Sequence, residues 1–289
     1  MGYSARYHAA SLAAVFLALA IGILIGAGLG DNLLSDTEEN LRESLEADID
    51  AARGEADELR VQRDRERAFA TRAYPALVSD SLDDRRIGVL ALGDLPQDLS
   101  ADIESALEPT GGELAQVAVI RLPPDAAGLA ANLGPRFAAL EEDNGAVEDL
   151  GRILGRQFVA AGGNQLERLR DELLARSSGE GGRLDGVIAV RGPHGELEPE
   201  QLARSEALES GLVAGMAETR ADVVGVERSG IEDSTIPFFA RFDVTTVDSV
   251  DLTSGRVALV FALLGAEGSF GIKETADSLL PDLLRRPAD

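Results

Sequence analysis

The 289-residue chain contains no cysteine and no tryptophan, and it has only two histidines and two methionines. The absence of cysteine excludes disulfides, thiolate catalysis, iron–sulfur clusters and zinc ribbons. Imidazole and thioether groups are so scarce that a tight transition-metal site built within one chain would lack ligands. We therefore predict no bound cofactor and name no metal-ligating residue.

Positive charge is the second shortage. The chain has 27 Lys and Arg against 51 Asp and Glu, which gives a formal net charge of −24. Nucleic acid is excluded as a partner because a duplex binder needs a basic patch to displace counterions. Hydrophobic residues make up 45% of the chain, enough for a real core, so disorder throughout is excluded as well.

A long apolar segment lies near the N-terminus. Residues 9–29 read AASLAAVFLALAIGILIGAGL, and about 20 such residues span a hydrocarbon layer of ~30 Å. We predict a single-pass anchor over residues 1–30, in the cell membrane. A cleaved signal peptide is the alternative, although its apolar region is usually only ~7–15 residues long. The positive-inside rule places the N-terminus in the cytoplasm and the domain outside, because Arg6 precedes the segment and acidic residues follow it, namely Asp31, Asp36, Glu38 and Glu39.

Small residues recur every four positions in this segment. Ala14, Ala18, Gly22 and Gly26 belong to a stripe of the kind that lets two helix backbones approach closely in lipid, where packing drives association. The stripe predicts self-association. The alternative is ordinary membrane composition, because glycine and alanine are frequent in membrane helices and a four-residue step winds around the helix.

Residues 31–80 form a charged segment with the composition of a helix. Five apolar residues within it alternate by four and three positions and predict a short coiled-coil seam: Leu45, Ile49, Ala52, Ala56 and Leu59. The seam lasts fewer than three heptads before Arg63 occupies it. A solvated stalk with ion pairs four residues apart is the alternative, and both interpretations give a rod.

From residue 85 onward the pattern is that of an α/β domain, residues 85–289. Helical stretches alternate with short apolar runs, which predicts a mostly parallel sheet with helices on both faces. The predicted strands are residues 87–92, 114–120, 185–190, 222–226 and 256–263, and the predicted helical regions are residues 97–107, 125–176 and 198–218.

Ligands of such sheets bind beyond the carboxyl ends of the strands. Asp94 follows the first strand, and the loop RGPHGE after the third places His194 and Glu196 there. No cysteine, second nearby histidine or G-x-S-x-G turn accompanies His194, so we interpret it as a solvated loop histidine. On that interpretation, truncating it would change stability by less than about 0.5 kcal/mol. We predict that the chain is not an enzyme.

Two further segments resemble binding sites weakly. The glycines of residues 265–271, GAEGSFG, lack the G-x-G-x-x-G spacing of a phosphate-binding loop. Asp243, Asp248 and Asp251 form an acidic cluster without EF-hand spacing, for which an aspartate-rich turn is the commoner explanation. Neither segment supports catalysis.

The two ends of the chain carry a family resemblance. Residues 8–35, HAASLAAVFLALAIGILIGAGLGDNLLS, and residues 245–281, TTVDSVDLTSGRVALVFALLGAEGSFGIKETADSLLP, resemble the signatures of the actinobacterial copper transport protein B family, also described as outer-membrane proteins. Two positions depart from the expected pattern. Ser249 stands where a second aspartate is expected, and Ser269 with Phe270 replaces a His-Tyr pair, which removes a candidate copper ligand at the C-terminus.

The resemblance implies copper homeostasis or copper transport across the cell envelope, with copper ions as possible partners on this ground alone. The residues themselves indicate a membrane-anchored homo-oligomer. The alternative function is an envelope interaction or scaffold module with no metal role. A third class, an enzyme built on a flavodoxin-like or amidotransferase-like sheet, is disfavoured by the absence of cysteine and the near-absence of histidine.

Overall fold

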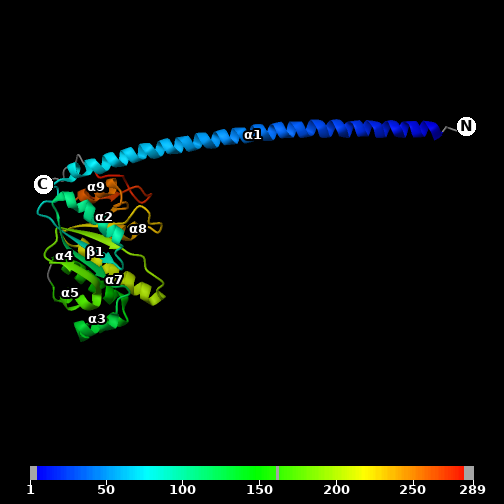
Figure 1. Cartoon of the computed structure of the whole chain (residues 1–289). Coiled ribbons are helices and arrows are strands. Elements are labelled where there is room, and N and C mark those ends of the chain that lie inside the picture. Colours follow the sequence, from blue (N-terminus) through cyan, green and yellow to red (C-terminus); the bar gives the residue numbers. More distant parts are fainter. Residues whose placement is uncertain (1–4, 161–162, 283–289) are drawn as a thin grey trace. The chain divides into compact units, whose positions relative to one another are not determined.

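The computed structural model describes residues 5–160 and 163–282, with side chains over residues 7–26, 41–160 and 163–282. The chain divides into two compact units, Met1–Arg67 and Ala68–Asp289. Each unit contains part of α1, a helix that is continuous from Ala5 to Val78 (Figure 1).

In the first unit, α1 passes through the apolar segment and into the charged segment. Tyr7–Gly26 is long and apolar enough to cross a membrane, and none of it is buried inside the protein. A signal sequence near the N-terminus has the same length and composition. The charges that predicted the orientation, Arg6, Asp31, Asp36, Glu38 and Glu39, lie outside the described side chains. The charged segment carries exposed ion pairs along the helix: Arg42 with Glu46, Arg53 with Asp50 and Arg60 with Asp57.

The last turns of α1 belong to the second unit. Tyr74 and Val78 are buried in one of its hydrophobic clusters, and the Tyr74 hydroxyl donates a hydrogen bond of 2.6 Å to the carbonyl oxygen of Ala106. Burial raises the pKa of Tyr74 well above its ordinary value. The helix therefore ends as part of the α/β core.

Within the described residues, the second unit contains a seven-stranded sheet in the order β3-β2-β1-β4-β5-β6-β7. Pairing is parallel throughout except at the β3 edge, where β3 runs antiparallel to β2. The central strands are almost wholly buried because they are covered on both faces. The strands are β1 Arg86–Leu92, β2 Glu113–Ile120, β3 Leu174–Gly179, β4 Gly186–Arg191, β5 Asp222–Val226, β6 Thr245–Val247 and β7 Ser269–Phe270.

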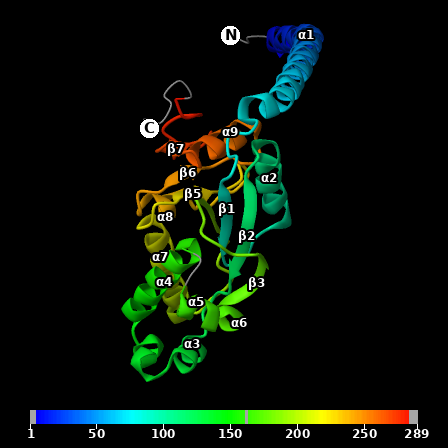
Figure 2. The same ribbon diagram turned by 90° about the vertical axis from the view of Figure 1, so that its left-hand side faces the viewer.

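Helices cover both faces of the sheet (Figure 2). Leu90 and Leu92 of β1 face a cluster with α3 Ala126–Leu133, α4 Asn144–Ala160 and α7 Pro199–Ala217. Val89 and Ala91 face the opposite cluster, with α2 Gln97–Leu107, α9 Thr253–Ala262 and the end of α1. The remaining short helices are η1 Glu108–Thr110, η2 Pro135–Glu141, α5 Asn164–Arg168, α6 Arg170–Leu173 and α8 Ile236–Ala240.

Glycines bring α4 and α7 into backbone contact. A Cβ atom at Gly151 would lie 2.6 Å from the carbonyl oxygen of Leu208. Cβ atoms at Gly155 and Gly211 would overlap the carbonyl oxygens of Leu212 and Glu148. The close approach thus depends on the absence of side chains at these positions.

The predicted α/β class with a mostly parallel sheet and helices on both faces is confirmed, and four of the five predicted strands form. The prediction of a strand over residues 256–263 is wrong, because this run lies in α9. Val257, Ala258, Leu259 and Val260 are all buried, and a short apolar run of this kind does not distinguish a buried strand from a buried helix.

Three strands were missed. β3 lies at the end of a region predicted to be helical, and its exposed, polar sequence ARSSG resembles a loop. β6 and β7 contain three and two residues, which is too short for any periodicity to appear. Each is recognised only by its partners in the sheet.

Candidate functional sites

The loops after β1, β4 and β5 meet at the carboxyl edge of the sheet, as expected for parallel strands. The backbones of the loops after β1 and β4 approach each other closely. A Cβ atom added at Gly192 would lie only 2.7 Å from the backbone nitrogen of Asp94. This edge therefore brings together two of the loops that the sequence singled out, those with Asp94 and His194.

His194 is not a solvated loop histidine, which corrects the interpretation from sequence. Its side chain is only 15% exposed, and Nε2 lies 2.9 Å from Oε1 of Glu209 on α7. Arg191, at the end of β4, donates two hydrogen bonds to the other carboxylate oxygen of Glu209, at 2.8 and 3.0 Å. The Arg191 guanidinium also stacks over the ring of Phe238, 4.2 Å from its centroid.

Glu209 is the centre of this cluster and has a fully buried side chain. Burial raises the pKa of Glu209, because a carboxylate loses hydration in the interior, while the hydrogen bonds and charges of Arg191 and His194 act in the opposite direction. Sequence reasoning missed this residue because α7 was recognised only as a helix. A glutamate among Leu208, Gly211 and Leu212 on its apolar face was the available signal.

His194→Ala is expected to lower the free energy of unfolding by about 1–3 kcal/mol, because it leaves Oε1 of buried Glu209 without its partner. Urea unfolding of the full chain, monitored through hydrogen exchange of the amides in the second unit, measures this change. Pro193→Ala in the same loop is a suitable control, because Pro193 is exposed. A change within about 0.5 kcal/mol would restore the original interpretation of His194 as a surface residue.

The C-terminal segment is tied to the same edge by the only lysine of the chain. Nζ of Lys273 lies 2.6 Å from Oε1 of Glu227 and 2.7 Å from the carbonyl oxygen of Ile231. Asp248 accepts hydrogen bonds of 2.9 Å from the backbone nitrogens of Ile272 and Lys273. The C-terminal signature segment, residues 245–281, thus holds the loop after β5 in place.

The predicted acidic cluster is dispersed into separate turns. Asp251 accepts hydrogen bonds of 2.6 Å from both the backbone nitrogen and the hydroxyl of Ser229, whereas Asp243 occupies a left-handed turn at φ 53°. Within residues 7–26, 41–160 and 163–282, whose side chains are described, no three His, Cys, Asp or Glu residues are arranged to hold a metal ion. Asp248 and Asp251 act as hydrogen-bond acceptors for loop backbone.

Asp251→Asn is expected to destabilise the protein near neutral pH and to have less effect in acid. Burial opposes ionisation of Asp251, but the hydrogen bonds from Ser229 outweigh it and hold the pKa below its ordinary value. The folded state therefore binds fewer protons, so the contribution is present above the ordinary pKa of about 3.9 and is lost as pH falls through the lowered value. Urea unfolding at neutral and acid pH tests this; an equal difference at every pH would contradict it.

The glycine-rich segment of residues 265–271 forms a turn and β7. Gly265, Gly268 and Gly271 adopt positive φ, and the Thr246 hydroxyl donates to the Ser269 hydroxyl at 2.8 Å. Ser249, the other departure from the family pattern, is fully buried, and its hydroxyl has no hydrogen-bond partner among the described residues.

The predicted association surfaces of α1 are exposed in the single chain. Nothing lies within 4 Å of a Cβ atom built at Gly22 or Gly26, and Ala14 and Ala18 are exposed as well. On the predicted seam, Leu45, Ile49 and Leu59 are 52%, 48% and 58% exposed, Ala52 is exposed and Ala56 is partly exposed. The structure therefore tests neither surface, and both stay predictions.

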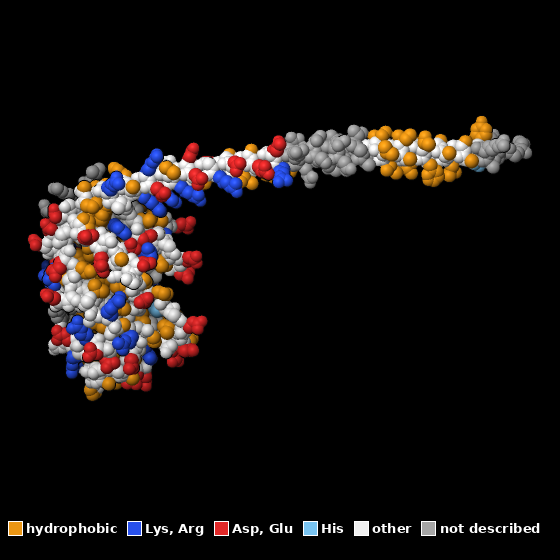
Figure 3. Space-filling view, viewed as in Figure 1, with side chains coloured by type: hydrophobic (Ala, Val, Ile, Leu, Met, Phe, Trp, Pro, Cys, Tyr) orange, Lys and Arg blue, Asp and Glu red, His pale blue; other side chains and the backbone are white. Residues whose placement is uncertain are grey.

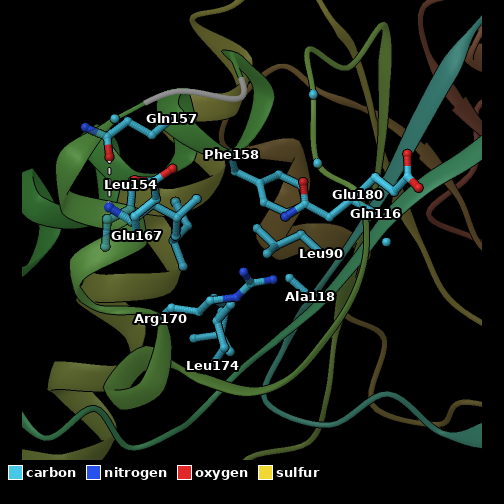
Figure 4. A pocket seen from close by; sticks show the side chains of 17 residues that line it. Leu90, Gln116, Ala118, Leu154, Gln157, Phe158, Glu167, Arg170, Leu174 and Glu180 are labelled. Atoms are coloured by element: carbon cyan, nitrogen blue, oxygen red, sulfur yellow. Dashed lines mark hydrogen bonds between the residues drawn. The ribbon is translucent and has the colours of Figure 1, made fainter.

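A small cavity of about 220 Å³ lies between the sheet and the α4–α6 region (Figure 4). Leu90, Ala118 and Phe158 form part of its apolar wall, and the Arg170 side chain extends toward it from α6. Both Nε and Nη2 of Arg170 donate to the Ser177 hydroxyl, so the guanidinium is already engaged by β3. Nothing further indicates a ligand there.

Together these observations define an α/β protein with a mostly parallel sheet and an N-terminal helix long and apolar enough to span a membrane. The family described as "Copper transport outer membrane protein, MctB" matches residues 3–281. The chain belongs to this family, which confirms the resemblance seen in the sequence. No curated protein sequence matches the chain. The family is one of copper transport, not of enzymes.

Proposed function

We propose that the chain acts in copper homeostasis or copper transport at the cell envelope, as a single-pass membrane protein with an external, self-associated α/β domain. Membership of the copper transport family carries the copper part of this proposal. The exposed apolar segment Tyr7–Gly26 supports the membrane part. The N-terminus lies in the cytoplasm because the flanking charge is positive before the segment and negative after it.

Copper is the cargo in this proposal, and the chain offers few ligands for it. It has no cysteine, Met216 is fully buried, and His194 is engaged by Glu209. One apolar helix does not enclose a pore, and Tyr7–Gly26 has no ionisable side chain to line one except at its start, Tyr7 and His8. A route for the ion would therefore be built by several copies of the chain or together with a partner.

The same scarcity of ligands favours a second candidate function, in which the acidic domain recruits an envelope partner and has no metal role. The α/β domain then serves as a binding module, without enzymatic activity. The two functions differ in one respect that is directly measurable, which is whether loss of the chain changes the handling of copper.

A deletion strain complemented with the full chain separates the two functions. Growth on graded copper and zinc, together with cellular metal content, would be compared with and without complementation. Copper accumulation and copper-specific growth inhibition that the full chain reverses would support the copper role. Normal copper content and tolerance, accompanied by an envelope defect that the chain reverses, would support the interaction module.

Self-association is proposed through both predicted surfaces of α1. The small-residue stripe offers close backbone approach in lipid, and the apolar seam continues along the same helix. Both surfaces are exposed in the single chain. A parallel dimer would cover the two together.

Gly22→Ile/Gly26→Ile is expected to reduce dimer formation in membranes, weakening association by about 1–2 kcal/mol because the larger side chains hold the backbones apart. The chain has no cysteine, so a single Ala52→Cys substitution on the seam gives a disulfide-linked dimer as an unambiguous signal. The double variant would be compared with the parent in this background.

Ala13→Ile/Ala20→Ile is the matched control, because these two residues lie on the opposite side of the helix from Gly22 and Gly26 at about 100° per residue. It should leave the cross-linking yield unchanged. A parent yield at background, or equal yields in all three proteins, would identify the stripe as ordinary membrane composition.

A further inference from the structure

A cavity of about 700 Å³ at the carboxyl edge of the sheet is not used by the copper proposal. It lies among the loops that follow β1, β4 and β5 and the first turns of α7. The chain leaves β1 toward β2 but leaves β4 toward β5, so strand order reverses at this point. Such a reversal opens a crevice that is the usual ligand site of open α/β sheets.

The size and lining of the cavity are those of a small-molecule site. Ligand pockets measure about 300–1,000 Å³ and are lined mainly by apolar side chains with a few polar groups. Here the apolar wall includes Pro96, Leu99, Val190, Leu197, Leu202 and Val226.

The cationic side chains of the wall are already neutralised. Arg191 donates to buried Glu209 and stacks on Phe238. Arg228 places Nε 2.9 Å from a carboxylate oxygen of Asp102. Neither guanidinium is left as a counterion for an anionic ligand.

The buried carboxylate of the wall is neutralised as well. Glu227 accepts hydrogen bonds from the Ser234 hydroxyl at 2.8 Å and from the Thr235 backbone nitrogen at 2.7 Å, and it pairs with Lys273 at 2.6 Å. Charge selection must therefore come from side chains nearer the mouth.

The mouth of the cavity is acidic on both sides. Glu232 and Asp233, on the loop after β5, are exposed and have no hydrogen-bond or ion-pair partner among the described residues, and Glu206 on α7 is 55% exposed. Figure 3 shows acidic side chains projecting on either side of a hollow that contains hydrophobic ones. Glu196 and Glu198, the sequence neighbours of the lining residue Leu197, and Glu200 at the start of α7 are exposed as well. An apolar cleft rimmed by one sign of charge concentrates ligands of the opposite sign.

We propose that this cavity binds a small organic cation, an ammonium group on an apolar body, with the body against the apolar wall and the ammonium at the acidic mouth. The inference does not depend on the copper role, since no residue of the cavity is assigned to copper.

Three compounds with the same apolar body test the proposal: 4-phenylbutylamine, 4-phenylbutan-1-ol and 4-phenylbutyrate. Each is titrated calorimetrically into the full chain in non-ionic detergent, which has no ammonium group to compete, with empty micelles as the blank. We expect saturable binding of the amine, about tenfold weaker binding of the alcohol and weaker binding still of the carboxylate, with the preference for the amine declining as salt screens the mouth.

Glu232→Gln/Asp233→Asn should weaken binding of the amine about threefold to tenfold and leave the alcohol unchanged, because only the charged group senses the lost carboxylates. Leu202→Trp should abolish binding of all three by filling the cavity. Glu142→Gln/Asp149→Asn removes the same charge from exposed positions elsewhere and should have no effect.

The proposal is overturned by an absence of saturable amine binding, or by alcohol or carboxylate binding as tightly as the amine. It is equally overturned if the Glu142 and Asp149 control weakens binding as much as the mouth variant, which would indicate diffuse attraction to an acidic protein. If Leu202→Trp does not fold, the variant Glu232→Gln/Asp233→Asn, whose changes are at exposed positions, still tests the proposal.

Discussion

Gly155→Ala is expected to lower the free energy of unfolding of the α/β unit by about 1–3 kcal/mol, even though alanine favours a helix over glycine by about 1 kcal/mol. The added methyl group would overlap the carbonyl oxygen of Leu212, so α4 and α7 would have to separate. Hydrogen exchange of the amides of both helices in native protein reports this change directly. The larger Gly155→Leu should prevent the helices from docking.

Gly54→Ala is the control for the intrinsic preference of the helix, because nothing lies within 4 Å of a Cβ atom at Gly54. Gly54→Ala should leave the hydrogen exchange of the α4 and α7 amides unchanged. Unaltered exchange in Gly155→Ala would show that α4 and α7 tolerate a wider separation than the structure has.

Glu209→Ala is expected to cost about 3–5 kcal/mol, the range observed when one partner of a buried ion pair is removed. The substitution leaves the Arg191 guanidinium, 16% exposed, without its carboxylate and removes the partner of His194. Urea unfolding monitored by exchange of β4 and α7 amides measures the loss.

The Arg191→Met/Glu209→Leu double variant is the informative comparison. Replacing both charges with apolar groups of similar size is often neutral, because neither charge is then left buried alone. We expect the double variant to be more stable than Glu209→Ala. A double variant as unstable as the single one would show that Arg191 contributes mainly through its stacking on Phe238.

The α/β class was predictable because β1, β2, β4 and β5 are mainly apolar runs separated by helical stretches. These strands are covered on both faces, so their burial is visible in composition alone. The same reasoning wrongly predicted a strand where α9 lies, because a run buried on every side loses the periodicity that distinguishes helix from strand. β3, β6 and β7 depend on neighbouring strands for their hydrogen bonds, and a local pattern does not record those.

The carboxyl edge of the sheet was predictable as a location, whereas its chemistry was not. His194 was placed correctly in the loop after β4, but its partner Glu209 lies 15 residues away on α7. The ion pair of Glu227 with Lys273 joins residues 46 positions apart. Contacts between residues this far apart in the chain arise from packing, and no spacing within a single sequence predicts them.

The position of Lys273 has a practical consequence for labelling. Apart from the N-terminus, its side chain carries the only primary amine of the chain, and that amine is held by Glu227 and the carbonyl oxygen of Ile231. Amine-reactive dyes and cross-linkers will therefore modify the folded protein slowly at this position. Reagents directed at carboxylates, or at a single introduced cysteine, will label the folded protein more efficiently and are better suited to cross-linking it to its neighbours.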